Sequence, residues 1–124
     1  NSLKFQKLLK RRPDVKIYAR SIFLQGLLLS EKKFWPNWVN SNKILMKIKH
    51  LRRSLNLKSN LELCLRYVLS INWISHIILG VENEKQLKNI LKISSKPIIT
   101  DKMIYKINNT FVNIPSRLIQ PYKW

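Results

Sequence analysis

Apolar residues along this chain recur at two spacings, one typical of helices and one typical of strands. Alternation within Val15–Ala19 and a nearly continuous apolar run over Ile74–Leu79 predict two strands, the second buried as in a parallel sheet. Helical spacing predicts four helices, over Leu3–Arg12, from Ser41 or Asn42 to Leu55, from Ser59 to Val68, and from Asn83 to about Ile93. Capping signals support the last two helices, because Glu62 follows Ser59 and Gln86 follows Asn83 at the required spacing.

Two regions lack such periodicity. The aromatic stretch 34–40 (FWPNWVN) contains a proline and predicts a packed loop or a lid. Residues 94–124 contain three prolines, so we expect an irregular tail that wraps the surface, with Leu118 in a short turn.

The succession of strand and helix, twice over, indicates a parallel α/β architecture. Two strands cannot close a sheet, and each would leave an edge unpaired. We therefore expect residues 1–124 to belong to a larger domain and not to be stable alone.

The formal net charge is +18, with 24 Lys and Arg residues against 6 Asp and Glu. Such a charge is typical of proteins that bind nucleic acid or another anionic surface. Composition offers a second explanation, which we favour: the chain has 17 Lys, 12 Asn and 16 Ile, the residues that AT-rich codons encode. A small basic nucleic-acid-binding protein is therefore the alternative function, although no helix-turn-helix, zinc-finger or RNA-recognition signature accompanies the charge.

Cys64 is the single cysteine, so no intramolecular disulfide can form, and a reducing cytoplasmic setting fits. No apolar run has the length of a membrane span, and residues 1–12 lack the apolar core of a signal peptide. Because the chain starts with Asn1 and not with Met, we expect a processed product or a fragment.

Two loops, 20–26 and 80–87, follow the predicted strands and contain the only glycines, Gly26 and Gly80. Glycine permits close approach of the backbone to a ligand. The second loop opens a helix, where free N–H groups and the helix dipole favour an anion. In a (β/α)₈ barrel the loops after strands seven and eight often form a phosphate site, so these loops are the candidate site.

Three stretches resemble aldo-keto reductases in order and spacing over residues 3–93. IYARSIFLQGLLL resembles the family's seventh strand, which is followed by Ser-Pro-Leu-x-x-Gly. WISHIILGVENEKQLKNIL resembles the eighth strand and its helix, usually Gly-Ala-Ser-x-x-x-Gln-Leu, and LKSNLELCLRYVLS resembles the helix before it. The wording RSIFLQGLLL and the Pro-x-x-Trp at 121–124 are similar to a bacterial branch found beside surface-polysaccharide genes.

The resemblance implies the C-terminal portion of a TIM (β/α)₈ barrel: strands seven and eight with their helices, and 94–124 as a tail of the same domain. It implies an oxidoreductase that uses NAD(P)H to reduce a carbonyl substrate, a sugar-derived one if the branch is right. The N-terminal part of the barrel would be the partner of this chain.

The resemblance also implies which residues bind the cofactor. The family's first loop lies along the pyrophosphate, which by position assigns Ser21, Ile22, Phe23, Gln25 and Gly26. Arg20 stands where many members place an aromatic that stacks on the nicotinamide, and a guanidinium can also stack. The second loop and its helix hold the adenosine end, which assigns Gly80, Val81, Glu82, Gln86 and Asn89.

The chain departs from the family's pattern at several of these positions. Ile22 replaces a usual Pro, and Asn89-Ile90 replaces a frequent Glu-Asn pair. Glu82 replaces a Ser that commonly binds the 2′-phosphate, and a carboxylate there would favour NAD. Lys85 can offset Glu82, so both NAD and NADP stay open.

The family's catalytic Asp, Tyr, Lys and His come from earlier strands, and no segment of this chain resembles them. We therefore predict no catalytic residue here and an inactive chain by itself. A degenerate subunit that docks on a complete barrel is a third hypothesis.

The remaining candidates are assigned to packing or to solvent. Gly-x-Ser-x-Gly is absent, one Cys and two distant His give no metal-ligand spacing, and the acidic residues form no catalytic pair. We expect His50 to be solvated, His76 to lie in the core or at a strand end, and Cys64 to be a packing residue. The aromatic residues Phe34, Trp35 and Trp38 either contact a substrate or pack the loop.

Overall fold

The computed structural model describes residues 2–31 and 34–123, with side chains from Gln6 onward. Trp124, the last residue of the Pro-x-x-Trp, and the side chains of Leu3 and Phe5 lie outside the described part. The elements in chain order are α1 (Ser2–Arg11), β1 (Tyr18–Ala19), η1 (Leu27–Leu29), α2 (Ser41–Ser54), α3 (Asn60–Leu69), β2 (His76–Ile77), α4 (Glu84–Ser94), α5 (Asp101–Thr110) and η3 (Pro121–Lys123). The order of the predicted helices and strands is confirmed.

The two strands pair in parallel, with Tyr18 opposite His76 and Ala19 opposite Ile77. The Ile17 carbonyl oxygen accepts from His76 N at 3.0 Å, and Ile78 N donates to Ala19 O at 2.8 Å. Both strands are shorter than the predicted Val15–Ala19 and Ile74–Leu79. The flanking residues have no further strand to pair with among the described residues, so the ladder ends after one short stretch.

One face of this sheet is covered and the other is not. Ile77 and Leu79 pack against a cluster of Leu65, Ile90 and Ile93, contributed by α3 and α4. On the opposite side Ile78 is 56% exposed, so the prediction of a buried second strand is wrong. A strand needs helices or sheet on both faces to be fully buried, and here they cover only one.

His76 begins β2 but does not lie in the core. It is exposed, and its ring stacks on the Tyr18 ring of the neighbouring strand with the centroids 4.6 Å apart. The pair is a cross-strand contact between residues in register.

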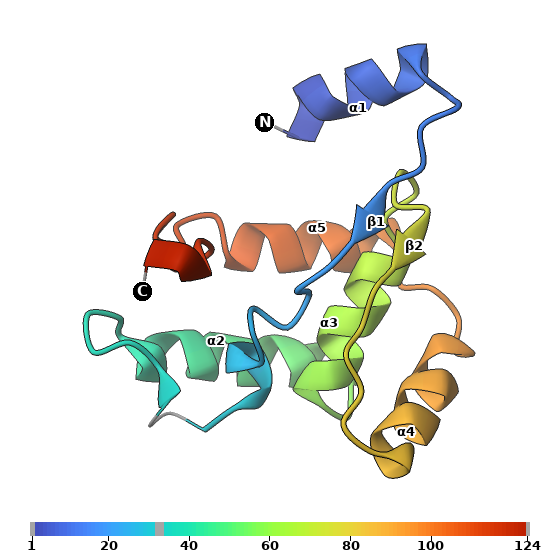
Figure 1. Ribbon diagram of the computed structural model, residues 1–124. Helices are drawn as coiled ribbons and strands as arrows, with labels where there is room; N and C mark the ends of the chain where they lie inside the picture. The colour runs from blue at the N-terminus through green and yellow to red at the C-terminus, as the bar shows by residue number, and fades with distance from the viewer. Residues whose placement is uncertain (1, 32–33, 124) are drawn as a thin grey trace.

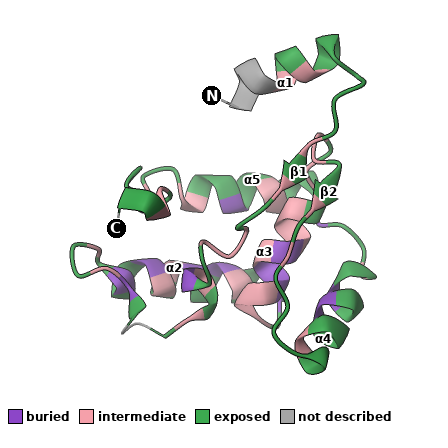
Figure 2. Cartoon of the chain, viewed as in Figure 1, coloured by how far each residue is buried: buried purple, intermediate pink, exposed green. Residues whose placement is uncertain are grey.

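The main core lies between α2, α3, α5 and η1 (Figure 2). The prediction of an irregular tail is wrong over 101–110, because this segment forms α5. Thr100 caps it, its hydroxyl oxygen accepting from Met103 N at 3.4 Å. Ile107 is buried against α2 and α3, and Ile99 and Leu118 on either side of the helix are each 2% exposed. The expected turn at Leu118 is confirmed, since Leu118 N donates to Pro115 O at 2.9 Å.

The helix caps follow the sequence signals closely. Ser59 Oγ accepts from Glu62 N at 3.0 Å, and Asn83 Oδ1 accepts from Gln86 N at 2.9 Å. The cap of α2 is Asn40, one residue before the prediction, and Ser41 is instead a buried first residue of the helix. All three caps satisfy N–H groups that a helix start leaves unpaired.

Glu62 joins α3 to the segment after α4. Its carboxylate is 3% exposed and accepts from Lys96 Nζ at 2.6 Å, from Arg66 at 3.3 Å and from Lys58 N at 2.9 Å. Burial by itself raises the pKa of the Glu62 carboxyl, but the bonds from Lys96 and Lys58 N–H outweigh it, and the pKa lies below its ordinary value. The network therefore holds an ionised carboxylate inside the fold.

The first helix differs from the rest in its surroundings. In Figure 1, α1 lies apart from the other helices, beyond the strand end at which the chain enters the sheet. In the described parts of the chain, no helix combines the length and apolar character needed to cross a membrane.

Candidate dinucleotide-binding site

The two candidate loops leave the sheet at the same edge, because β1 and β2 are adjacent and parallel (Figure 1). Both loop regions also pack against the same apolar cluster. Ile22 of the first loop and Leu79, just before the second, both pack against the cluster of Leu65, Ile90 and Ile93. The structure thus brings together two loops that are more than fifty residues apart, as the parallel order predicted.

The first loop has an unusual backbone. Ser21, Leu24, Gln25 and Gly26 have φ angles of 57°, 52°, 56° and 81°. Only Gly26 adopts this left-handed region without cost, and each of the other three residues costs about 1–2 kcal/mol. Strain of this kind persists more often at sites that bind ligands than elsewhere.

The loop presents backbone donors. Within the described part of the chain, no acceptor is bonded to the N–H groups of Ser21, Ile22, Phe23, Gln25 and Gly26. Successive N–H groups in turns of this kind form concave anion-binding nests. Arg20, Ser21, Gln25 and Gly26 are exposed, whereas Ile22 and Phe23 are half-buried. A Cβ placed at Gly26 would meet no described atom within 4 Å, so the backbone there is accessible.

The second loop ends in the start of α4, where the cap is reciprocal. Asn83 Oδ1 accepts from Gln86 N at 2.9 Å, and Gln86 Oε1 accepts from Glu82 N at 2.8 Å. Within the part of the chain that the structure describes, no acceptor is bonded to the N–H groups of Glu84 and Lys85 at the helix start. Gln86 therefore has a structural role through its oxygen, and its amide nitrogen is bonded to no described residue.

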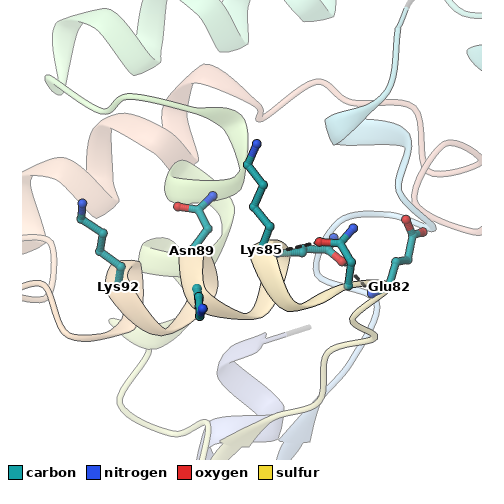
Figure 3. Close-up of a pocket in the computed structure, with 7 residues that line it drawn as sticks. Glu82, Lys85, Asn89 and Lys92 are labelled. Carbon is teal, nitrogen blue, oxygen red and sulfur yellow. Dashed lines mark hydrogen bonds between the residues drawn. The ribbon is translucent and has the colours of Figure 1, made fainter.

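A groove of ≈ 640 Å³ runs along α4 from this start. Figure 3 shows Lys85, Asn89 and Lys92 projecting from one side of the helix, with Glu82 at the end where the helix begins. The groove brings together three predicted cofactor residues, Glu82, Gln86 and Asn89, with Asn83, Lys85, Lys88 and Lys92. Gly80 and Val81 are exposed and lead into it, while Arg20 and the first loop are not in its lining.

Lys88 and Lys92 are absent from the residues that the sequence predicted. Their spacing from Lys85, three and seven residues along the helix, places all three on one side and would have indicated them. Lys88 also pairs with Glu84 at 2.5 Å, on a surface where both side chains are about three-quarters exposed. The charged side chains that line the groove are lysines, apart from the carboxylate of Glu82.

The remaining histidine, cysteine and aromatic candidates lie outside the two candidate loops. His50 is exposed, as expected. Burial raises the pKa of the Cys64 thiol to about 11, which keeps it protonated at neutral pH and agrees with a packing role. Trp35 is 5% exposed in the main core, so it packs the loop. Trp38 lies under the Arg117 guanidinium, 4.6 Å from the ring centroid, and Phe34 is 63% exposed. Among the described residues there is no group of three or more His, Cys, Asp and Glu that could hold a metal ion.

Comparison with known proteins identifies the family. The model of the Aldo/keto reductase family matches residues 2–110, from the start of α1 to the end of α5. This chain belongs to the aldo/keto reductase family. Neither the curated proteins nor the solved structures gave a match.

The aldo/keto reductases are an oxidoreductase family, as the sequence motifs predicted for this chain. Members have a TIM barrel, generally use NAD(P)H and act on carbonyl substrates. Five helices and two parallel strands are consistent with part of such a barrel. The match extends through α5 and so includes residues 94–110 of the predicted tail.

Proposed function

We propose that this chain forms the C-terminal, cofactor-binding part of an aldo-keto reductase barrel that reduces a carbonyl with NAD(P)H. One observation carries the proposal. Two anion-favouring backbone features, the donor-rich loop at 21–26 and the start of α4, follow two adjacent parallel strands at the same edge. This edge of a (β/α)₈ barrel is where cofactors and substrates bind.

The candidate residues can be assigned to the successive parts of a dinucleotide. The pyrophosphate oxygens would accept hydrogen bonds from the N–H groups of Ser21, Ile22, Phe23, Gln25 and Gly26, which are bonded to no described acceptor. The adenosine would follow Gly80 and Val81 into the α4 groove, beside Glu82, Gln86 and Asn89. Arg20 is exposed at the end of β1, where its planar guanidinium can stack on the nicotinamide. When bound, the cofactor supplies a hydride for the carbonyl carbon.

The charge of the groove bears on the choice between NAD and NADP. Glu82 alone would disfavour a 2′-phosphate, but Lys85, Lys88 and Lys92 line the same groove. Lys88 is paired with Glu84, so two ammonium groups, Lys85 and Lys92, stand against the Glu82 carboxylate. This excess of positive charge supports binding of the phosphorylated cofactor, with Glu82 weakening it. We therefore propose that the site accepts NADP in preference to NAD.

The proton-transfer residues would come from the remainder of the barrel, which is the partner that this chain needs. The exposed side of the sheet, with Tyr18 and Ile78, is the surface that further strands would cover. The proposal includes a bacterial enzyme and a carbonyl on a sugar-derived substrate, which rest on the resemblance of RSIFLQGLLL and of the Pro-x-x-Trp at 121–124. It also includes a cytoplasmic setting, which rests on the single cysteine, Cys64.

Extending the reading frame upstream of Asn1 tests the activity. We expect Asp, Tyr, Lys and His at the ends of preceding strands, and their absence would remove the reductase proposal. The cofactor role is tested separately, by titrating NADPH and NADH into the protein made from the complete reading frame and following cofactor fluorescence. Failure of both cofactors to bind at millimolar concentration would contradict the assignment of these loops.

A further inference from the structure

A second groove, of ≈ 560 Å³, lies between α2 and α5, away from the dinucleotide site. Its rim carries Lys43, Lys47, His50 and Lys106, and its apolar part includes Met46 and Leu51. None of these residues belongs to the two candidate loops or to α4. We refer to it as the α2–α5 groove.

Positive charge at the α2–α5 groove is uncompensated. Helix α2 contains five Lys and Arg residues between Ser41 and Ser54 and no Asp or Glu. Among the described residues no acidic side chain lines the groove, and Asp101 lies in the first turn of α5, outside the lining. The Lys47 ammonium donates to the Thr110 carbonyl oxygen at 3.2 Å, which fixes its position without neutralising it. By contrast, α4 carries Glu84 paired with Lys88.

The apolar part of the groove favours a protein partner over a nucleic acid. Met46 is 59% exposed although cations lie on both sides of it, and Leu51 is buried beneath. An exposed methionine is adaptable and is frequent on surfaces that receive apolar side chains of a peptide. The phosphates of a nucleic acid could pair with the lysines, but its backbone has no apolar group to contact Met46. Among the described residues, no aromatic side chain lines the groove to stack on a base.

We propose that the α2–α5 groove binds an acidic amphipathic segment of a partner protein. Apolar side chains of that segment would contact Met46, which lies over the buried Leu51, and its carboxylates would pair with Lys43 and Lys106. This is the helix-in-groove mode of recognition, with charge complementarity selecting the partner. The proposal does not depend on cofactor binding at the other site.

The proposed binding can be tested by fluorescence anisotropy with a labelled 18-residue peptide. This probe peptide has Leu at helical spacing and Glu at the other positions. The protein is the one made from the complete reading frame, with helicity of every variant checked by circular dichroism. We expect Lys43→Gln with Lys106→Gln to weaken binding by about fivefold or more, as two lost rim charges should. The matched control, Lys49→Gln with Lys102→Gln, removes the same charge from the same helices outside the groove, and we expect a change below about twofold.

Three results would overturn the proposal. Equal weakening by the two double variants would show attraction to net charge only. Equal binding of a probe with every Leu replaced by Ser would show that the apolar part has no role. Tighter binding of a single-stranded oligonucleotide of the same charge, lost in the Lys43 and Lys106 variant, would assign the groove to nucleic acid.

Discussion

Glu62 is a buried carboxylate that joins α3 to the segment after α4 through cations from different parts of the chain. Lys96 and Arg66 both lie within bonding distance of one of its oxygens, Oε1, and the Lys58 N–H bonds the other. The sequence indicated Glu62 only as a capping residue. Its electrostatic role depends on Lys96, thirty-four residues away, and was therefore not predictable from local spacing.

We expect Glu62→Ala to lower the free energy of unfolding by about 2 kcal/mol, below the 3–5 kcal/mol typical of a broken buried pair because Lys96 is partly solvated. Urea unfolding followed by circular dichroism measures this. The control is Glu84→Ala, which removes an exposed pair and should change the free energy by less than about 0.5 kcal/mol. Equal effects of the two substitutions would contradict the network.

The same residue gives a dependence on pH. The pKa of Glu62 is lowered in the folded chain, so its contribution to stability is complete above the unfolded pKa of about 4.3. The contribution is lost as the pH falls through the folded pKa, because protonation then costs the bonds to Lys96 and Arg66. Urea midpoints of the wild type should therefore begin to approach those of Glu62→Gln as the pH falls below about 4.3, the unfolded pKa, and should go on approaching them at lower pH. A constant gap down to pH 3 would argue against it.

At the proposed cofactor site, Lys85 and Glu82 should have opposite effects on NADPH. We expect Lys85→Glu to weaken NADPH binding by roughly tenfold and Glu82→Ser to strengthen it by roughly threefold, while NADH changes little. Fluorescence titration of each cofactor gives both affinities. Lys49→Glu makes the same charge change outside both grooves and should leave the ratio of NADPH to NADH affinity unaltered.

Among the elements, helix starts were the best predicted. Ser59 and Asn83 are caps because a side-chain oxygen and an N–H three residues later are fixed by local geometry alone. Strand lengths were overestimated, because a strand ends where its neighbour stops offering hydrogen bonds, which only the paired sheet decides. Helix α5 was missed because prolines at 97, 115 and 121 outweighed the spacing of Met103, Ile104 and Ile107.

The reciprocal cap of α4 can be tested by substitution. Asn83→Ala should cost about 1 kcal/mol, since it leaves the Gln86 N–H without its acceptor. Chemical denaturation gives the difference, and amide exchange at the first turn of α4 should speed up. Asn109→Ala, in an exposed position of α5 that caps nothing, is the control and should stay within about 0.5 kcal/mol. An undisturbed first turn in Asn83→Ala would contradict the capping role.

For the molecule as a whole, α5 and its flanks complete the main core. Ile99 and Leu118 are each 2% exposed in the cluster that α2 and α3 form. The C-terminal segment also reaches the aromatic loop, where Arg117 stacks on Trp38. The segment expected to wrap the surface is thus part of the main core, and its helix α5 contributes Lys106 and Thr110 to the α2–α5 groove.

Ile98 and Ile99 offer a matched pair for this conclusion. Ile99→Ala should lower the free energy of unfolding by about 2–4 kcal/mol, because it leaves a cavity in the core. Ile98→Ala, at a position 69% exposed, should change it by less than about 0.5 kcal/mol. Thermal or urea unfolding gives both values, and similar effects would mean that α5 does not dock as described.

The sequence by itself determined the family, the order of strands and helices, and the two glycine-bearing loops, because each depends on local spacing and on residue types. Tertiary structure decided which face of the sheet is covered, that 101–110 is a helix of the core, and that Glu62 meets Lys96. It also gathered Lys85, Lys88 and Lys92 beside Glu82, and left the α2–α5 groove lined with cations. These features arise from contacts between distant segments, whose free energy depends on packing that no local pattern records.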